Sequence, residues 1–445
     1  AGVDMEMAGC AYTDHLPELI DEGKVSINKI DTMVANILRA KFRLGLFDNA
    51  YTNPDKLPEL ANQEALQVAK SAALESVVML KNEHSILPLS STALSSIAVI
   101  GPLANDKHEQ LGTWIFDADK DLTITGLQGI NDLVGAELDV RYVAAMKTSR
   151  THSTEQFDEA LSIASDADVT VLFLGEESIL SGEARSRADI DLPGAQIELV
   201  RKIREIGKPV VAVILAGRPL TLGNIIEHVD AILYAWHPGT MGGPAIADLL
   251  FGIQSPSGKL PVTFPHKVGQ LPIYYNHKHT GRPPTQEEVV YIDDIQQYAE
   301  HTSLGMTSFH IDANFKPLFP FGYGLSYANF EYHNIHLSAF ELNFGDTLKV
   351  SAEVFNNSDI DAVEIVQLYI RDLVGSVTRP VKELKGFTRQ SLKAGERKRV
   401  QFELHTDDLA FHGRDMKLKA ESGLFHIWVG GNSDSGLSSE FRLNE

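Results

Sequence analysis

Apolar residues in the first part of the chain recur at intervals of three and four positions. Residues 16–48 therefore predict two helices, the second beginning at a capping residue, Ser26 or Asn28. No strand pattern accompanies these helices, so their apolar face needs a partner outside this stretch. The next segment, 49–60, is rich in turn-forming residues and is typical of a linker between domains. The apolar face of the second helix consists of Ile30, Met33, Val34, Ile37, Leu38 and Phe42.

The middle of the chain alternates predicted strands with predicted helices, beginning with a helix over 62–80. Four apolar runs are nearly continuous, as expected for parallel strands that are buried on both faces. Helical patterns at 194–207 and 242–252 belong to the same alternation. Together they predict an α/β sandwich domain over 96–275, in which ligands bind outside the carboxyl ends of the strands. The four runs lie at 97–101, 169–175, 209–217 and 231–236.

The last part of the chain changes pattern again. Residues 326–445 contain short strand-like runs separated by turns, without a helical pattern, which predicts a β-sandwich. Between the two predicted domains, the segment 276–325 is polar and irregular. A connection of this length without regular structure is usually functional or forms an interface. A homodimer formed through this segment is therefore one expectation.

Composition narrows the range of partners. The 445 residues carry a formal net charge of −21, which opposes binding to nucleic acid and to anionic membranes. No apolar run is long enough to span a bilayer, and the single cysteine, Cys10, allows neither an internal disulfide nor a cysteine-built metal site. The opening AGVDMEMAGC has no basic or apolar leader pattern and resembles the middle of a folded unit, so we expect a missing N-terminal portion.

The usual ligand motifs of α/β sheets do not occur. The sequence has no dinucleotide-binding glycine pattern, no phosphate-loop lysine and no G-x-S-x-G serine elbow. His277 and His279 lack a carboxylate at ligand spacing and are interpreted as solvated surface residues, so no metal is expected. His237 is interpreted as a hydrogen-bonded turn residue. Asp4 and Glu6 precede helices, where acids commonly stabilise helix starts, and are interpreted as structural.

A strongly charged loop follows the predicted central strand. Glu176, Glu177 and Glu183 lie at the carboxyl end of this strand, where a cleft is expected. Arg185 and Arg187 stand beside them. From composition alone, a catalytic loop and a solvated loop whose charges neutralise one another are equally plausible.

A second loop, after the first strand of the α/β domain, contains an aromatic residue. Trp114 stands in the stretch LGTWIFDADKD, which has no amphipathic periodicity. An exposed tryptophan can stack on the apolar face of a sugar ring, whereas a position in an interface or partly in the core is equally plausible. One acidic and one aromatic loop at the same edge of a sheet would form a wall suited to carbohydrate.

Several longer stretches match a known pattern. They include AGVDMEM, KFRLGLFDNAY, GEARSRADIDLPGAQ, AWHPGTMGGPAIADLLFG and FPFGYGLSY. Together they resemble glycoside hydrolase family 3, in the branch of bacterial periplasmic β-glucosidases, over essentially the whole chain. The resemblance implies an N-terminal (β/α)8 barrel, then an α/β sandwich, then a fibronectin type III-like domain. Residues 1–48 would be the last helices of the barrel, 49–95 a linker and helix, and 326–445 the fibronectin type III-like domain.

The resemblance also implies roles for individual residues. The position of the family's general acid/base is matched by Glu183, and Glu176 and Glu177 would support its loop. Trp114, with Phe116, matches an aromatic wall of the outer sugar subsite. The nucleophile of the family is an aspartate on the barrel, just upstream of the AGVDMEM stretch, and it has no counterpart in this chain.

The implied chemistry restricts the neighbours of the acid/base. Retaining β-glycosidases use two carboxyl groups about 5 to 5.5 Å apart, one as nucleophile and one as acid and then base. A glutamate in the second role must keep its proton near neutral pH, which a neighbouring arginine would oppose. We therefore expect Arg185 and Arg187 to face other carboxylates, such as Glu176 or Asp189, rather than Glu183.

The resemblance implies a retaining exo-β-glucosidase that releases terminal non-reducing β-D-glucosyl residues by double displacement. Its substrates would be β-glucosides or short β-gluco-oligosaccharides, its location would be periplasmic or secreted, and it would require no metal or organic cofactor. This chain would supply the acid/base and would be inactive without the barrel portion. Two alternatives remain open: a β-xylosidase or other exo-glycosidase of the family, and a carbohydrate-binding or assembly fragment without catalysis.

Overall fold

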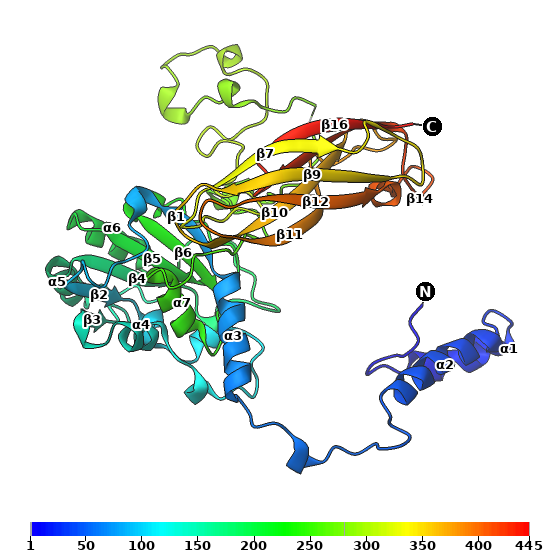
Figure 1. Ribbon diagram of the computed structural model, residues 1–445, viewed down its shortest axis with the longest axis horizontal. Coiled ribbons are helices and arrows are strands. Elements are labelled where there is room, and N and C mark those ends of the chain that lie inside the picture. The colour runs from blue at the N-terminus through cyan, green and yellow to red at the C-terminus, as the bar shows by residue number, and fades with distance from the viewer. Residues whose placement is uncertain (1, 280, 445) are drawn as a thin grey trace. The chain divides into compact units, whose positions relative to one another are not determined.

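The computed structural model describes residues 2–279 and 281–444, and the chain divides into two units, Ala1–Asn62 and Gln63–Glu445 (Figure 1). The first unit contains helices α1 (Ala11–Asp21) and α2 (Ile27–Arg43). The second helix begins at Ser26, one of the two predicted starts. No residue of either helix is buried, so this unit leaves most of the apolar face of α2 uncovered, although Phe42 contacts Phe47 with ring centroids 4.4 Å apart.

The second unit begins with α3 (Gln63–Ser76), which is shorter than the predicted helix over 62–80. The end of that prediction is wrong, because the chain forms strand β1 (Val78–Asn82), which pairs antiparallel with β6 (Ala231–Trp236). The first three residues of β1 are buried. Continuous apolar residues satisfy a helix pattern and a fully buried strand equally well, and burial in the sheet decides for the strand.

A six-stranded sheet forms the centre of the α/β domain, in the order β1-β6-β5-β4-β2-β3. The four strands predicted from apolar runs are all present and pair in parallel. The edge strand β3 (Asp139–Val143) was not predicted, because its residues are mostly half-buried and include charged side chains. The other strands are β2 (Ser96–Ile100), β4 (Val169–Gly175) and β5 (Val210–Leu215).

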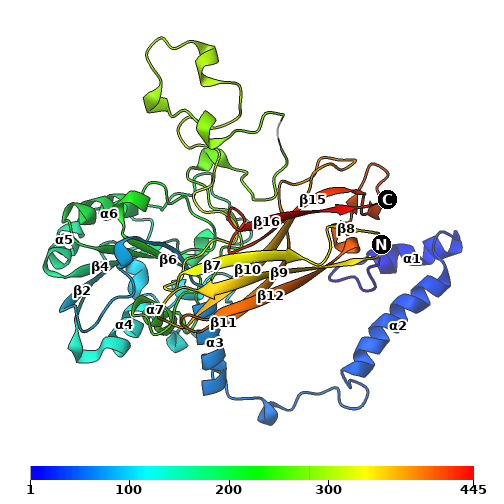
Figure 2. The same cartoon turned by 45° about the horizontal axis from the view of Figure 1, so that its top comes forward.

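Helices cover both faces of this sheet (Figure 2). Apolar residues of α5 (Phe157–Asp166) and α6 (Gln196–Glu205) pack with one face of the strands into one core. The opposite face packs with α3, α4 (Gly126–Val134) and α7 (Gly242–Leu250) into a second core. The predicted α/β sandwich is therefore confirmed as three layers, helix on sheet on helix.

A β-sandwich follows, as predicted. One sheet has the order β12-β9-β7 and the other has the order β11-β10-β15-β16-β8. Alternate residues of the long strands point inward and form the common core, which includes Val350, Leu368 and Ile427. The strands are β7 (Phe330–Leu337), β8 (Glu341–Leu342), β9 (Thr347–Asn356), β10 (Ala362–Asp372), β11 (Glu383–Leu392), β12 (Arg397–His405), β15 (Gly423–Gly430) and β16 (Leu437–Leu443), with a separate pair β13 (Phe411–His412) and β14 (Leu418–Lys419).

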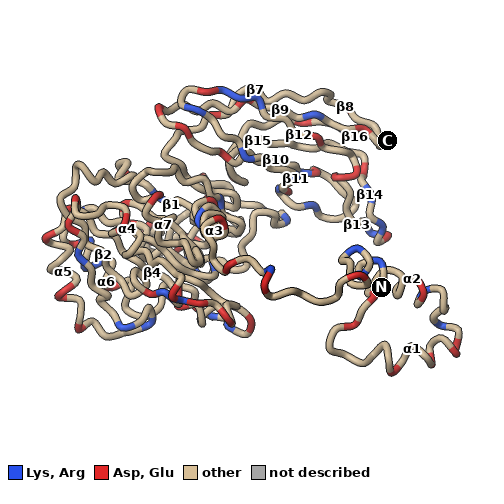
Figure 3. Tube along the Cα trace, turned by 60° about the horizontal axis from the view of Figure 1, so that its bottom comes forward, with Lys and Arg blue, Asp and Glu red and all other residues tan. Residues whose placement is uncertain are grey.

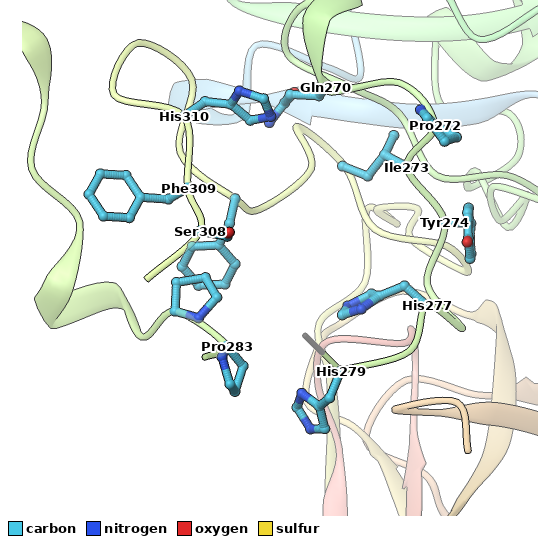
Figure 4. A pocket seen from close by; sticks show the side chains of 12 residues that line it. Gln270, Pro272, Ile273, Tyr274, His277, His279, Pro283, Ser308, Phe309 and His310 are labelled. Atoms are coloured by element: carbon cyan, nitrogen blue, oxygen red, sulfur yellow. The ribbon is translucent and has the colours of Figure 1, made fainter. Parts of the chain in front are cut away.

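The segment between the two domains extends away from the strands, and its described part carries short 3-10 helices and isolated β-bridges (Figure 1). It returns to the α/β domain where Phe264 and Phe319 exchange backbone hydrogen bonds and where the backbone N–H of Leu325 donates to Met79 at 2.8 Å. A hollow of about 450 Å³ lies along this segment, with His277, His279 and His310 among its lining side chains (Figure 4).

Acidic and basic residues are interspersed along the chain in both units (Figure 3). The net charge of −21 is thus spread over the molecule rather than confined to one tail. Among the helices of the described residues, none has the length and apolar character needed to cross a membrane.

Candidate active site

The candidate active site lies at the carboxyl edge of the parallel sheet, where the loops after β2, β4, β5 and β6 meet. Glu109, after β2, accepts hydrogen bonds from the backbone N–H and the hydroxyl of Ser178, after β4, at 2.5 and 2.8 Å. Gly217, after β5, has no room for a side chain, because an added Cβ would lie 2.4 Å from the hydroxyl oxygen of Ser181 and 2.8 Å from Cε1 of His237. Strand direction explains this gathering, because parallel strands end at the same edge.

Two of the three glutamates after β4 are held by arginines. The side chain of Glu176 is 0% exposed and accepts hydrogen bonds from Arg187 and, at 3.0 Å, from Nε of Arg218. Glu177 accepts from the hydroxyl of Ser149 at 2.9 Å and from Arg150 at 3.0 and 3.2 Å. Buried carboxylates with such partners fix the loop in place.

Glu183 differs from its two neighbours. It is exposed, and its carboxylate has no hydrogen bond or ion pair with any residue that the structure describes. It stands in a tight turn between Gly182, with φ of +105°, and Ala184, with φ of +59°. A carboxyl group without a partner remains available to a ligand.

The predicted orientation of the arginines is half right. Arg187 pairs with Glu176, as expected. The partner predicted for Arg185 is wrong, because its guanidinium donates to the backbone oxygen of the adjacent Ala184 at 3.2 Å and not to a carboxylate. Exposure explains the difference, because a solvated guanidinium gains little from an ion pair. Neither arginine pairs with Glu183.

An aromatic pair stands beside the turn that carries Glu183. Trp114 is 60% exposed and Phe116 is 85% exposed, and their ring centroids lie 5.8 Å apart in an edge-to-face arrangement. An added Cβ at Gly182 would lie 3.3 Å from the methyl group of Thr113 and 3.6 Å from the indole nitrogen of Trp114. The structure therefore brings an exposed aromatic surface next to the turn that carries Glu183.

His237 follows β6 at the same edge of the sheet. The predicted hydrogen bond is not found at its Nε2 atom, which is buried without a partner among the described residues. The hydroxyl of Ser181 is buried and unpartnered in the same way. Burial lowers the pKa of the His237 imidazole below its ordinary value.

His237→Asn is expected to make the stability of the protein less sensitive to acid. The imidazole pKa is about 6.5 in an unfolded chain and lower in the folded protein. As the pH falls below about 6.5, the unfolded chain binds a proton that the folded protein excludes, so the free energy of unfolding decreases until the folded pKa is reached. Thermal unfolding of both proteins between about pH 8 and about pH 5 measures this. Melting curves that shift in parallel would contradict the assignment.

The remaining candidates have structural roles or none. The carboxylate of Glu6 accepts hydrogen bonds from the first backbone N–H groups of α1, at Ala11 and Tyr12, which confirms its predicted role at a helix start. Asp4 accepts from the side-chain amide of Asn36 at 2.9 Å. His277 and His279 are exposed, as predicted. Within residues 2–279 and 281–444 no group of three or more histidine, cysteine or acidic residues could hold a metal ion.

A role for Arg218 was not predicted from the sequence. It follows Gly217 directly at the carboxyl end of the run 209–217. The same rule that selected the loop after β4 places the residues after every parallel strand at this edge, so strand direction could have identified it.

Comparison with known proteins identifies the class to which this arrangement belongs. Residues 77–327 match the glycosyl hydrolase family 3 C-terminal domain, and residues 364–433 match a fibronectin type III-like domain. The first of these matches places the chain among proteins that carry a glycosyl hydrolase C-terminal domain. The chain belongs to glycosyl hydrolase family 3, since the first match spans more than half of its length.

The chain is similar to several known proteins over its full length. It is 37% identical to a periplasmic beta-glucosidase of Salmonella typhimurium and 34% identical to a putative beta-xylosidase of Formosa agariphila. The solved structure of a mutant beta-glucosidase from Listeria innocua in complex with laminaribiose superposes with a TM-score of 0.87 at 37% identity. All of this chain is covered in each case, but it spans only 59%, 55% and 59% of those proteins, respectively.

Proposed function

We propose that the protein is a retaining exo-β-glucosidase that releases terminal non-reducing β-D-glucosyl residues, and that Glu183 is its general acid/base. The observation that carries this proposal is the contrast within one loop. Glu176 and Glu177 are held by arginines, whereas Glu183 is unpaired and follows Gly182, which lies beside the exposed Trp114 of the Trp114–Phe116 pair. A site that cleaves a glycosidic bond needs an unpaired carboxyl group next to a surface on which a sugar can stack.

The nucleophile is proposed to come from a (β/α)8 barrel portion that acts together with this chain. In the first step, the protonated Glu183 gives its proton to the glycosidic oxygen while the nucleophile carboxylate bonds to the anomeric carbon and the leaving group departs. In the second step, the carboxylate of Glu183 takes a proton from water, whose oxygen attacks the anomeric carbon and releases the nucleophile. The chain alone is expected to be inactive, because residues that act as a unit lose most of their effect when one is removed.

The substrate class is supported by the relatives. The Salmonella protein is named a periplasmic beta-glucosidase, and the Listeria enzyme was solved with laminaribiose and with glucose. We therefore propose β-glucosides and short β-gluco-oligosaccharides as substrates and the periplasm, or secretion, as the location. A homodimer formed through the segment 276–325 stays a prediction.

A β-xylosidase is the second candidate, because the Formosa relative carries that name. Comparing the hydrolysis of aryl β-D-glucoside and aryl β-D-xyloside by the complete enzyme, chain plus barrel portion, separates the two. We expect a clear preference for the glucoside. If the xyloside is preferred, the substrate assignment is wrong. If neither is hydrolysed while sugars still bind, the alternative of a carbohydrate-binding fragment is correct.

Trp114→Ala is expected to raise KM for laminaribiose about fivefold, because an aromatic stacking contact contributes on the order of 1 kcal/mol and about 1.4 kcal/mol is a factor of ten. The effect should be much smaller for methyl β-glucoside, whose leaving group has no ring to stack. Phe387→Ala is the matched control, since Phe387 is an exposed aromatic residue on β11 of the sandwich. Equal effects of Trp114→Ala on both substrates would contradict a role in the outer subsite.

A further inference from the structure

The arginine that follows β5 contacts both ends of the turn that carries Glu183. Its Nη2 atom donates hydrogen bonds to the backbone oxygen of Leu180 and, at 2.8 Å, to the backbone oxygen of Arg185. These two carbonyl groups flank residues 181–184. The same guanidinium donates from Nε to Glu176 at 3.0 Å. One side chain, Arg218, therefore joins the buried start of the loop to both ends of the turn.

The anchor of this arrangement is rigid. Glu176 directly follows β4, is fully buried, and is also held by Arg187, which donates to the backbone oxygen of Asp191 at 2.9 Å. On the other side, the backbone oxygen of Arg218 accepts a hydrogen bond from the hydroxyl of Tyr234, a buried residue of β6. The guanidinium of Arg218 is therefore held at the end of β4, and its backbone is held by β6.

The turn itself has little internal support. Within it, the backbone N–H of Arg185 donates to Gly182 at 3.2 Å, and the hydroxyl of Ser181 has no partner among the described residues. Ala184 has a positive φ, which is unfavourable for a residue with a Cβ and persists only where surrounding contacts impose it. The contacts from Arg218 are such contacts.

We propose that Arg218 is a positioning residue that holds the carboxyl group of Glu183 in the geometry needed for proton transfer to the leaving group. This proposal rests on the proposed function of Glu183. A catalytic group must be held within about 0.5 Å of its productive position, and a displacement of about 1 Å can cost on the order of 100-fold in rate. A planar guanidinium can bind a carboxylate and two carbonyl groups at once, which a lysine ammonium on a flexible stem does not reproduce.

Arg218→Lys in the complete enzyme, chain plus barrel portion, tests the proposal through the dependence on leaving group. We expect kcat/KM for laminaribiose to fall about 10- to 100-fold, because its departure needs a proton. For 2,4-dinitrophenyl β-glucoside, whose leaving group needs no proton, kcat/KM should stay within about threefold of the unmodified enzyme. The readout is the ratio of kcat/KM for laminaribiose to kcat/KM for 2,4-dinitrophenyl β-glucoside. General damage to the fold lowers both values and leaves this ratio unchanged.

Arg204→Lys is the matched control. Arg204 donates two hydrogen bonds to the mostly buried Asp230 at the opposite edge of the same sheet, so the same substitution alters an equivalent pair remote from the loop. Its ratio should equal that of the unmodified enzyme. If Arg218→Lys does not fold, Glu176→Gln replaces it in the test, because this substitution weakens the contact between Arg218 and residue 176. We then expect a smaller decrease of the ratio.

The outcomes separate this proposal from the proposed function. If Glu183→Gln lowers the ratio and the folded Arg218 or Glu176 variant leaves it unchanged, the positioning role is wrong and the acid/base assignment stands. If Glu183→Gln itself leaves the ratio unchanged, the acid/base assignment is wrong.

Discussion

Glu183→Gln is expected to lower kcat/KM for laminaribiose by about 100- to 10,000-fold in the complete enzyme, because a positioned general acid contributes about this much to the rate. The amide keeps the size of the side chain but cannot give a proton to the glycosidic oxygen. Glu183 is exposed and has no hydrogen bond or ion pair within the described residues, so the substitution should leave the melting temperature nearly unchanged. Loss of activity without loss of stability is therefore the expected result.

Two further measurements identify the step that is lost. With 2,4-dinitrophenyl β-glucoside, glycosylation of the enzyme needs no acid, so this step should survive and the glycosyl-enzyme should accumulate. Added azide, which attacks without a general base, should then restore turnover and yield β-glucosyl azide with retained configuration. The matched control is Glu198→Gln on α6. Glu198 is paired with Lys202 only at 3.9 Å, so this substitution should leave the activity unchanged. Full activity of Glu183→Gln on laminaribiose would falsify the assignment.

Gly175→Ala is expected to destabilise the α/β domain by about 3 to 5 kcal/mol, the sum of overpacking and of a backbone conformation unfavourable to alanine. Gly175 ends β4 with φ of +137°, and an added Cβ would lie 1.8 Å from the backbone oxygen of Leu215 on β5. No rotamer can relieve this overlap, because both atoms belong to hydrogen-bonded strands. Urea unfolding of the purified chain, followed by tryptophan fluorescence, measures the loss.

Gly207→Ala provides the comparison. Gly207, just after α6, also has a positive φ, of +80°, but nothing lies within 4 Å of an added Cβ. The only penalty there is that alanine disfavours a positive φ, so the free energy of unfolding should decrease by about 1 kcal/mol. Equal losses for the two variants would show that the close approach of β4 and β5 is relaxed in solution.

The layers of the α/β domain could be predicted from the sequence because its central strands are buried on both faces. Such strands exclude polar side chains and appear as continuous apolar runs. Strand β3 was not predicted because this edge strand is partly solvated and carries Asp139 and Arg141. Strand β1 was not predicted because its apolar residues continue the pattern of α3. Only its pairing with β6 distinguishes a strand from a longer helix.

The candidate site could be predicted in part. Strand direction placed the acidic and aromatic loops at one edge, and both lie there. Composition could not decide which glutamate is free, because Glu176, Glu177 and Glu183 share one charged stretch. Their partners come from elsewhere: Arg218 lies 42 residues from Glu176, and Arg150 lies 27 residues from Glu177.

By itself, the sequence determined the order of the domains, the buried strands and the edge of the sheet at which function is expected, because burial and strand direction leave local patterns. Only the tertiary structure decided that Arg187 and Arg218 meet at Glu176, that the exposed Arg185 forms no ion pair, and that the turn carrying the unpaired Glu183 lies beside Trp114. These facts depend on contacts between loops that follow different strands. A charge pattern along the chain carries no information about such contacts until the strands bring the loops together.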